Sequence, residues 1–237
     1  DLVGNTTTAQ ITVTENIDNE FEYKVIDTQY VSITHYIGNK PRVIVPSTIN
    51  NYPVKTIALK AFEACATVEY IYIPSSIEEI GTYPIGDKIK NEASTFIGCS
   101  NLNTVEIDLN NQYYTNNNGD GVIYDKNKTK LYYYPTAKTG SSFTIINGIT
   151  SIEGSAFADC KNINTIVTPE GLTIIGAEAF ANCKNLSKIT LNEGVKTINV
   201  GAFELCKSLE EIKLPSTVET IGSGAFLACV ELTKIDI

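Results

Sequence analysis

An Ala-Phe pair recurs every 23 residues, and this repeat restricts the possible folds more than any other feature of the chain. The regular pairs end at Phe157, Phe180, Phe203 and Phe226. Each Phe is followed by a Cys three residues later and by apolar residues six and nine residues later. Two earlier copies, around Phe62 and Phe96, keep the same order. A sparse pattern repeated in this way predicts a solenoid of stacked, similar coils.

The coil that precedes Phe226 shows how one repeat is expected to fold. Ile212 and Leu214 alternate with polar residues, which predicts a short strand with one buried face. Pro215 ends that strand because it lacks a backbone donor. Val218 and Ile221 then point inward from a return segment. One coil cannot bury its own apolar face, so we predict a right-handed β-solenoid with one short strand per coil.

The irregular distances between copies of the repeat indicate where the domain boundaries and the insertions lie. Residues 1–29 are predicted to be a polar linker and an N-terminal cap strand, and residues 30–237 to form the solenoid. Residues 30–60 are expected to make a degenerate first coil. Extra residues indicate one insertion near 82–92 and another near 110–147, the second being a hairpin or an irregular extra coil.

The two ends of the chain predict a piece of a longer protein. The sequence contains no Met, and it stops at Ile237 directly after a predicted strand. A solenoid end of this kind needs a cover, so we expect that the parent protein continues or that a partner binds there.

These motifs resemble the BspA-type leucine-rich repeats of bacterial surface proteins. The resemblance rests on the Ala-Phe pair, the Cys, the Ile73-Pro74 strand end and the Ile80-Gly81 return. The insertion fits too, through residues 121–124 and the run Leu131-Tyr132-Tyr133-Tyr134-Pro135. The resemblance covers residues 30–237 and implies a leucine-rich-repeat-like fold and a surface binder or adhesin. It implies no shared catalytic residues.

Composition and motifs argue against several function classes. The net charge of −9 is unsuited to binding nucleic acid, which requires a basic face. No apolar run reaches the roughly 18 residues of a membrane span. His35 is the only histidine, and no nucleotide, metalloprotease or nucleophile motif is present. We therefore predict a protein that is not an enzyme and has no cofactor.

Two features that resemble metal sites have simpler interpretations. All six cysteines hold the same repeat position, which predicts a ladder of parallel free thiols. The ligands of a zinc ion would instead point toward one centre. The Asn- and Gly-rich segment 116–121 resembles a calcium loop, but Asp120 is its only carboxylate. A structural turn is the favoured interpretation.

The tyrosines supply the best clue to function. All 13 lie between Tyr23 and Tyr134. Alternation around Ile71 places two of them on the outer face of a strand, and others lie in the insertion. An exposed Tyr offers a large amphipathic contact area at low entropic cost. The predicted ligand-binding residues are Tyr70, Tyr72, Tyr113, Tyr114, Tyr132 and Tyr133. The alternative is that these rings pack locally over the irregular coils.

The sequence therefore favours an extracellular or cell-surface binding module for a protein or glycan of a host or neighbouring cell. The second hypothesis is a structural spacer within a longer surface protein. Loss of binding in a Tyr70→Ser/Tyr72→Ser variant would distinguish the two.

Overall fold

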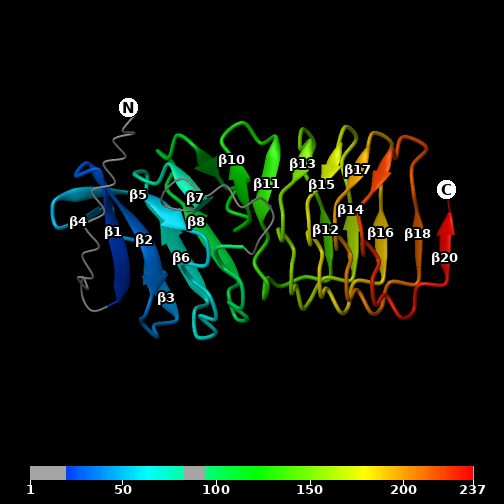
Figure 1. Cartoon of the computed structure of the whole chain (residues 1–237), viewed down its shortest axis with the longest axis horizontal. Coiled ribbons are helices and arrows are strands. Elements are labelled where there is room, and N and C mark those ends of the chain that lie inside the picture. Colours follow the sequence, from blue (N-terminus) through cyan, green and yellow to red (C-terminus); the bar gives the residue numbers. More distant parts are fainter. Residues whose placement is uncertain (1–19, 83–93, 237) are drawn as a thin grey trace, which may run out of the picture.

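The computed structural model describes residues 20–82 and 94–236, which form a β-solenoid of about eight turns (Figure 1). These residues contain strands and turns and no helix. The coils are stacked along the long axis, with β1 near one end and β20 at the other. The predicted repeat solenoid is confirmed.

Each regular coil contributes two strands, one more than predicted. We call the sheets of first strands the strand row and those of second strands the return row. The strand row comprises β3 (Arg42–Ile44), β6 (Tyr70–Ile73), β8 (Thr104–Ile107), β12 (Ser142–Thr144), β14 (Thr165–Val167), β16 (Lys188–Thr190), β18 (Glu211–Lys213) and β20 (Lys234–Asp236). The return row comprises β5 (Tyr52–Ala58), β7 (Glu79–Thr82), β11 (Lys130–Tyr133), β13 (Ser151–Ile152), β15 (Ile174–Ile175), β17 (Thr197–Ile198) and β19 (Thr220–Ile221). The second strand forms because the return segments are also in parallel register, with Ile152 opposite Ile175.

The first coil is covered by a hairpin. β1 (Phe21–Ile26) pairs antiparallel with β2 (Tyr30–Tyr36), which pairs parallel with β5, and the short β4 (Thr48–Ile49) also pairs with β5. β1 therefore lies at the edge of this sheet. The edge that would face an earlier coil is thus closed by a strand of the chain itself.

Stacked aromatic rings form the centre of the core. Phe180 has its ring centroid 4.9 Å from that of Phe157 and 5.1 Å from that of Phe203. Two tyrosines take the ring position in coils that lack an Ala-Phe pair. Tyr134 stacks on Phe157 at 4.9 Å, and Tyr36 stacks on Phe62 at 5.5 Å. Tyr134 precedes Phe157 by 23 residues, so the second insertion includes a complete coil.

The cysteines form the predicted ladder of free thiols. Each thiol donates to the carbonyl oxygen of the ring residue in the preceding coil. Cys183 Sγ lies 3.0 Å from the oxygen of Phe157, and Cys206 Sγ lies 3.1 Å from that of Phe180. A thiol suits this position because it is small, apolar and still a weak donor.

The ladder predicts which thiols react in the folded protein. Cys65 and Cys229 are partly exposed, whereas the other four are buried. Interaction with the Cys99 side chain lowers the pKa of Cys65, and burial raises that of Cys229 to about 11. Because the thiolate is the reactive species, a disulfide reagent at pH 8 should label Cys65 first and Cys229 slowly. All six should react in urea, and rapid labelling of more than two thiols in the native protein would contradict the buried ladder.

Both rows are interrupted at the same level of the solenoid. Among the described strands, β8 does not pair with β12, and β7 does not pair with β11. The core divides there as well, since Tyr133 belongs to the N-terminal cluster and Tyr134 to the C-terminal one. The predicted insertion at 82–92 falls, apart from Thr82, outside the described residues. We call this level the break.

Side chains and a hairpin replace strand pairing at the break. β9 (Tyr114–Thr115) and β10 (Ile123–Asp125) pair antiparallel, and β10 pairs with β11. Asn116 then satisfies the open edge of β8: its amide donates to Val105 O at 3.0 Å, and its Oδ1 accepts from Ile107 N at 2.8 Å. The edge is therefore hydrogen-bonded without a neighbouring strand.

Candidate functional site

A hollow of about 680 Å³ lies at the break beside β8, between that strand and the loop 115–121. Tyr72, Glu106, Asp108 and Leu109 line it. Parallel register places Tyr72 between Ile44 of β3 and Glu106 of β8. Because side chains at paired positions share one face of a sheet, these residues form a continuous surface next to the hollow. We call this surface, with Arg42 and Tyr70, the tyrosine face.

Carboxylates and one guanidinium group hold the two tyrosines of this face in place. The hydroxyl of Tyr70 donates to Glu106, and that of Tyr72 donates to Asp108. The guanidinium carbon of Arg42 lies 3.6 Å from the centre of the Tyr70 ring. The hydrogen bond to Asp108 raises the pKa of Tyr72 to about 12 and lowers that of the carboxyl. Both groups therefore keep their hydrogen-bonded forms at neutral pH.

Apolar side chains stand beside these polar groups. Ile44 is 52% exposed and Leu109 is 93% exposed. The face thus combines two ordered aromatic rings, exposed aliphatic carbon and negative charge. Exposed tyrosine and aliphatic side chains are typical of protein contact surfaces, in which tyrosine supplies rigid contact area.

The six predicted tyrosines do not form one surface. Tyr113 is exposed, whereas Tyr132 lies on β11 of the return row. Tyr114 and Tyr133 are buried, only 7% and 3% exposed, although Tyr133 lines part of the second hollow described below. Tyr114 instead accepts a hydrogen bond from the backbone nitrogen of Ile80 at 3.0 Å. Tyr133 packs against Phe96, with ring centroids 4.7 Å apart. The rings of Tyr114 and Tyr133 fill the core at the break, so these two residues follow the alternative in which tyrosines pack locally over the irregular coils.

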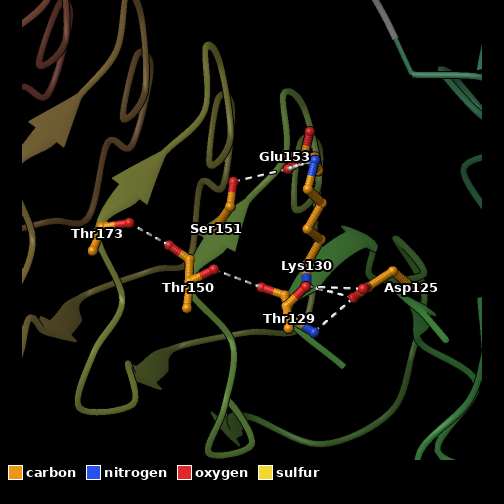
Figure 2. A network of polar contacts seen from close by, with 7 residues as sticks. All are labelled: Asp125, Thr129, Lys130, Thr150, Ser151, Glu153 and Thr173. Atoms are coloured by element: carbon orange, nitrogen blue, oxygen red, sulfur yellow. Dashed lines mark hydrogen bonds and ion pairs between the residues drawn. The ribbon is translucent and has the colours of Figure 1, made fainter. Parts of the chain in front are cut away.

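A second hollow, a groove of about 840 Å³, crosses the break in the return row. Gly81 and Thr95 line it on one side, and β11 and β13 line it on the other. Figure 2 shows the polar network along its C-terminal side. Thr150 Oγ1 donates to Thr129 O at 3.2 Å, and Thr173 Oγ1 donates to Thr150 O at 2.9 Å. We call this hollow the return groove.

Sequence reasoning missed the return groove because it depends on which return strands fail to pair. The available signal was the coincidence of two irregular spacings, one on each side of Phe96. Insertions in repeat proteins map to loops on one face, often the face that binds.

The segment 116–121 uses its oxygen ligands internally. Asp120 Oδ1 accepts from the backbone nitrogens of Asn117 and Val122 at 3.2 and 3.0 Å, and its Oδ2 accepts from the hydroxyl of Tyr124 at 2.9 Å. Within residues 20–82 and 94–236, no group of three or more His, Cys, Asp or Glu residues is placed to hold a metal ion. The segment is therefore a hydrogen-bonded turn, as the structural interpretation predicts.

In the described parts of the chain, no segment forms a helix long and apolar enough to cross a bilayer.

Comparisons with known proteins agree with this architecture. The family model for the BspA type leucine rich repeat region matches residues 47–120 and 127–237, in six copies. A T. pallidum leucine rich repeat protein is 25% identical with a TM-score of 0.56, and the match covers 92% of this chain and 90% of the other.

Two further solved structures show the same fold. A leucine rich cell surface protein of Faecalibacterium prausnitzii A2-165 is 18% identical, with a TM-score of 0.52 and 93% of each chain covered. The pneumococcal vaccine antigen PcpA is 16% identical with a TM-score of 0.61, over 94% of this chain and 81% of the antigen. No curated protein matches the sequence. The family model spans most of the chain, which therefore belongs to the BspA-type leucine-rich repeat family.

Proposed function

We propose that the chain is a non-catalytic binding module of a secreted or cell-surface protein, and that its tyrosine face binds a protein of a host or neighbouring cell. One observation carries this proposal: Tyr70 and Tyr72 are ordered by Glu106 and Asp108 on an open sheet, beside a hollow. Side chains that are already ordered lose little entropy on binding.

The charge and location of the face support the same function. Two carboxylates and a net charge of −9 favour a partner with a basic patch, because complementary potentials speed association. Location outside the cell is proposed by analogy with the F. prausnitzii protein, which is named a cell surface protein. Catalysis is not proposed, since the single histidine lines neither hollow.

A spacer is the second candidate function. The regular coils favour it, because the rings from Phe157 to Phe226 stack at 4.9 to 5.4 Å and extend the molecule uniformly. A spacer would need no ordered tyrosine pair at the break, however, so the two functions predict different results for changes on the tyrosine face.

The test measures binding of the purified chain to a panel of purified extracellular matrix proteins by biolayer interferometry. Tyr70→Ser/Tyr72→Ser is expected to raise Kd for a bound protein by more than about tenfold, because central tyrosines dominate such interfaces. The matched control is Lys188→Ser/Thr190→Ser, which changes the equivalent outward positions of β16 and should leave Kd unchanged. Circular dichroism checks that both variants are folded.

Two results would contradict the proposal. Equal loss of binding in both double variants would show that the tyrosine face is not the contact surface. Absence of binding to any protein of the panel would favour the spacer.

A further inference from the structure

Four lysines occupy one repeat position in four consecutive coils. Lys161, Lys184 and Lys207 directly follow a cysteine of the thiol ladder, and Lys138 holds the same place in the coil whose ring is Tyr134. The turns that carry them lie along one edge of the solenoid, directly before β12, β14, β16 and β18 (Figure 1). Three of the four are exposed, and Lys138 is half-buried. We call these four residues the lysine row.

Side-chain hydrogen bonds keep the lysine row in register. Asn185 Nδ2 donates to Lys161 O at 2.6 Å, and Ser208 Oγ donates to Lys184 O at 2.7 Å. Asn162 makes the same contact with the first lysine of the row at 3.1 Å. Neighbouring lysines are therefore one coil apart, and the rings of the same coils are separated by 4.9 to 5.1 Å. The four side chains thus start from points that span about 15 Å in a straight line.

The lysine row carries positive charge that the protein itself does not neutralise. Within residues 20–82 and 94–236, none of the four lysines forms an ion pair with an acidic side chain. Lys138 Nζ donates instead to the backbone oxygen of Asp120. The carboxylate of Asp159, the acid closest to the row in sequence, accepts from an asparagine of the next coil. Lysines on the return side differ, since Lys55 and Lys196 each pair with a glutamate of the next coil.

The fold does not require lysine at this position. The three remaining copies of the motif have Ala66, Ser100 and Val230 after their cysteine. Like charges at neighbouring stacked positions repel each other, so the four lysines lower a stability that small neutral residues would keep. A ligand with negative charges at matching intervals would remove this repulsion, and its binding would stabilise the folded chain.

The surroundings of the lysine row restrict the chemistry of such a ligand. The Debye length at physiological salt is about 8 Å, so a ligand in contact responds to the row more than to the net charge of −9. Asn162 and Asn185 use their amide nitrogens in the contacts above, and each offers its amide oxygen as an acceptor for hydroxyl groups. Nucleic acid fits less well, because base stacking requires aromatic rings and the residues flanking the lysines include none in 137–139, 160–162, 183–185 or 206–208.

We propose that the lysine row binds a linear sulfated glycan. Sulfate groups along the glycan accept from the ammonium groups, and sugar hydroxyls donate to the amide oxygens of Asn162 and Asn185. The sugar units of such a chain repeat at a spacing similar to that of the coils, so successive units can meet successive lysines. The row lies on coils that follow the break, whereas the tyrosine face lies on β3, β6 and β8, so this proposal is independent of the proposed function.

The experiment titrates the purified chain with a size-fractionated heparin oligosaccharide by isothermal calorimetry at several salt concentrations. Lys161→Ser/Lys184→Ser/Lys207→Ser installs the residue of the Phe96 copy and should raise Kd at least about tenfold. The slope of log Kd against log salt should fall by about two, if each lysine displaces about 0.7 counterions as at a single-stranded nucleic acid. The melting temperature should be unchanged or higher, because the repulsion within the row is removed.

A matched variant controls for net charge. Lys55→Ser/Lys130→Ser/Lys196→Ser removes the same number of positive charges from lysines that are ion-paired, and it should leave Kd unchanged. Tyr70→Ser/Tyr72→Ser should also leave Kd unchanged, so failure of the lysine row is distinguishable from failure of the tyrosine face.

Other polymers and surfaces test the chemistry of the ligand. Desulfated heparin should not bind, whereas poly(glycerol phosphate), oligothymidylate and phosphatidylserine vesicles should bind at least about tenfold more weakly than the sulfated oligosaccharide. The proposal is overturned if heparin does not bind at physiological salt, or if the control with three altered ion-paired lysines loses as much affinity as the variant of the row. It is also overturned if any of the other anions binds as tightly as heparin.

Discussion

Phe180→Ala is expected to lower the free energy of unfolding by about 3–5 kcal/mol. The ring of Phe180 is completely buried and lies between two others, nearly parallel to Phe203 at an interplanar angle of 4°. Removing this ring removes one ring-stacking contact with each of the two neighbouring coils. The cavity cannot close, because parallel pairing of β14, β16 and β18 fixes the separation of the coils.

Urea denaturation followed by far-ultraviolet circular dichroism measures this change. Phe180→Leu is the control and should cost less, since it keeps most of the buried volume. A loss below about 1 kcal/mol for the alanine variant would show that the stacked rings are not the centre of the core.

Asn111→Ala is expected to cost about 3–5 kcal/mol, although the change removes only a small polar side chain. Asn111 is completely buried. Its amide donates to Pro74 O and Ile77 O at 3.1 and 2.8 Å, and its Oδ1 accepts from the backbone nitrogens of Tyr113 and Tyr114 at 2.9 and 2.8 Å. The alanine variant leaves these backbone groups at the break without partners.

The same denaturation experiment tests this variant against Asn185→Ala. Asn185 is exposed and donates to a single backbone oxygen, that of Lys161, so its loss should cost less than about 1 kcal/mol. Equal effects of the two changes would mean that Asn111 does not hold the break together.

The regular coils were predictable because each of their positions has one physical role. The ring, the thiol and the strand residues recur every 23 residues, and the structure places Phe180, Cys183 and Ile189 in the core as expected. A periodic sequence defines such positions without any knowledge of distant contacts.

The break was not predictable in the same way. Tyr132, Tyr133 and Tyr134 are consecutive, and strict alternation would place the first and third on one face. Tyr134 instead turns inward, because β11 ends at Tyr133 and the chain then continues the core of the next coil. The role of Asn111 depends on two carbonyl groups more than 30 residues earlier in the chain, and no local pattern encodes that contact.

The thiol ladder gives the solenoid a direction. Each coil with a Cys supplies the donor for the ring carbonyl of the coil before it, and in the regular region its own ring carbonyl accepts from the thiol of the next coil. Within the regular region one whole coil can therefore follow another, whereas a partial coil would leave a thiol or a ring carbonyl without its partner. Duplication of 23 codons within the regular region would lengthen the molecule by about 4.8 Å and preserve every contact type. The length of the solenoid can therefore change during evolution in steps of one coil, without changes to the core or to the break, where both hollows lie.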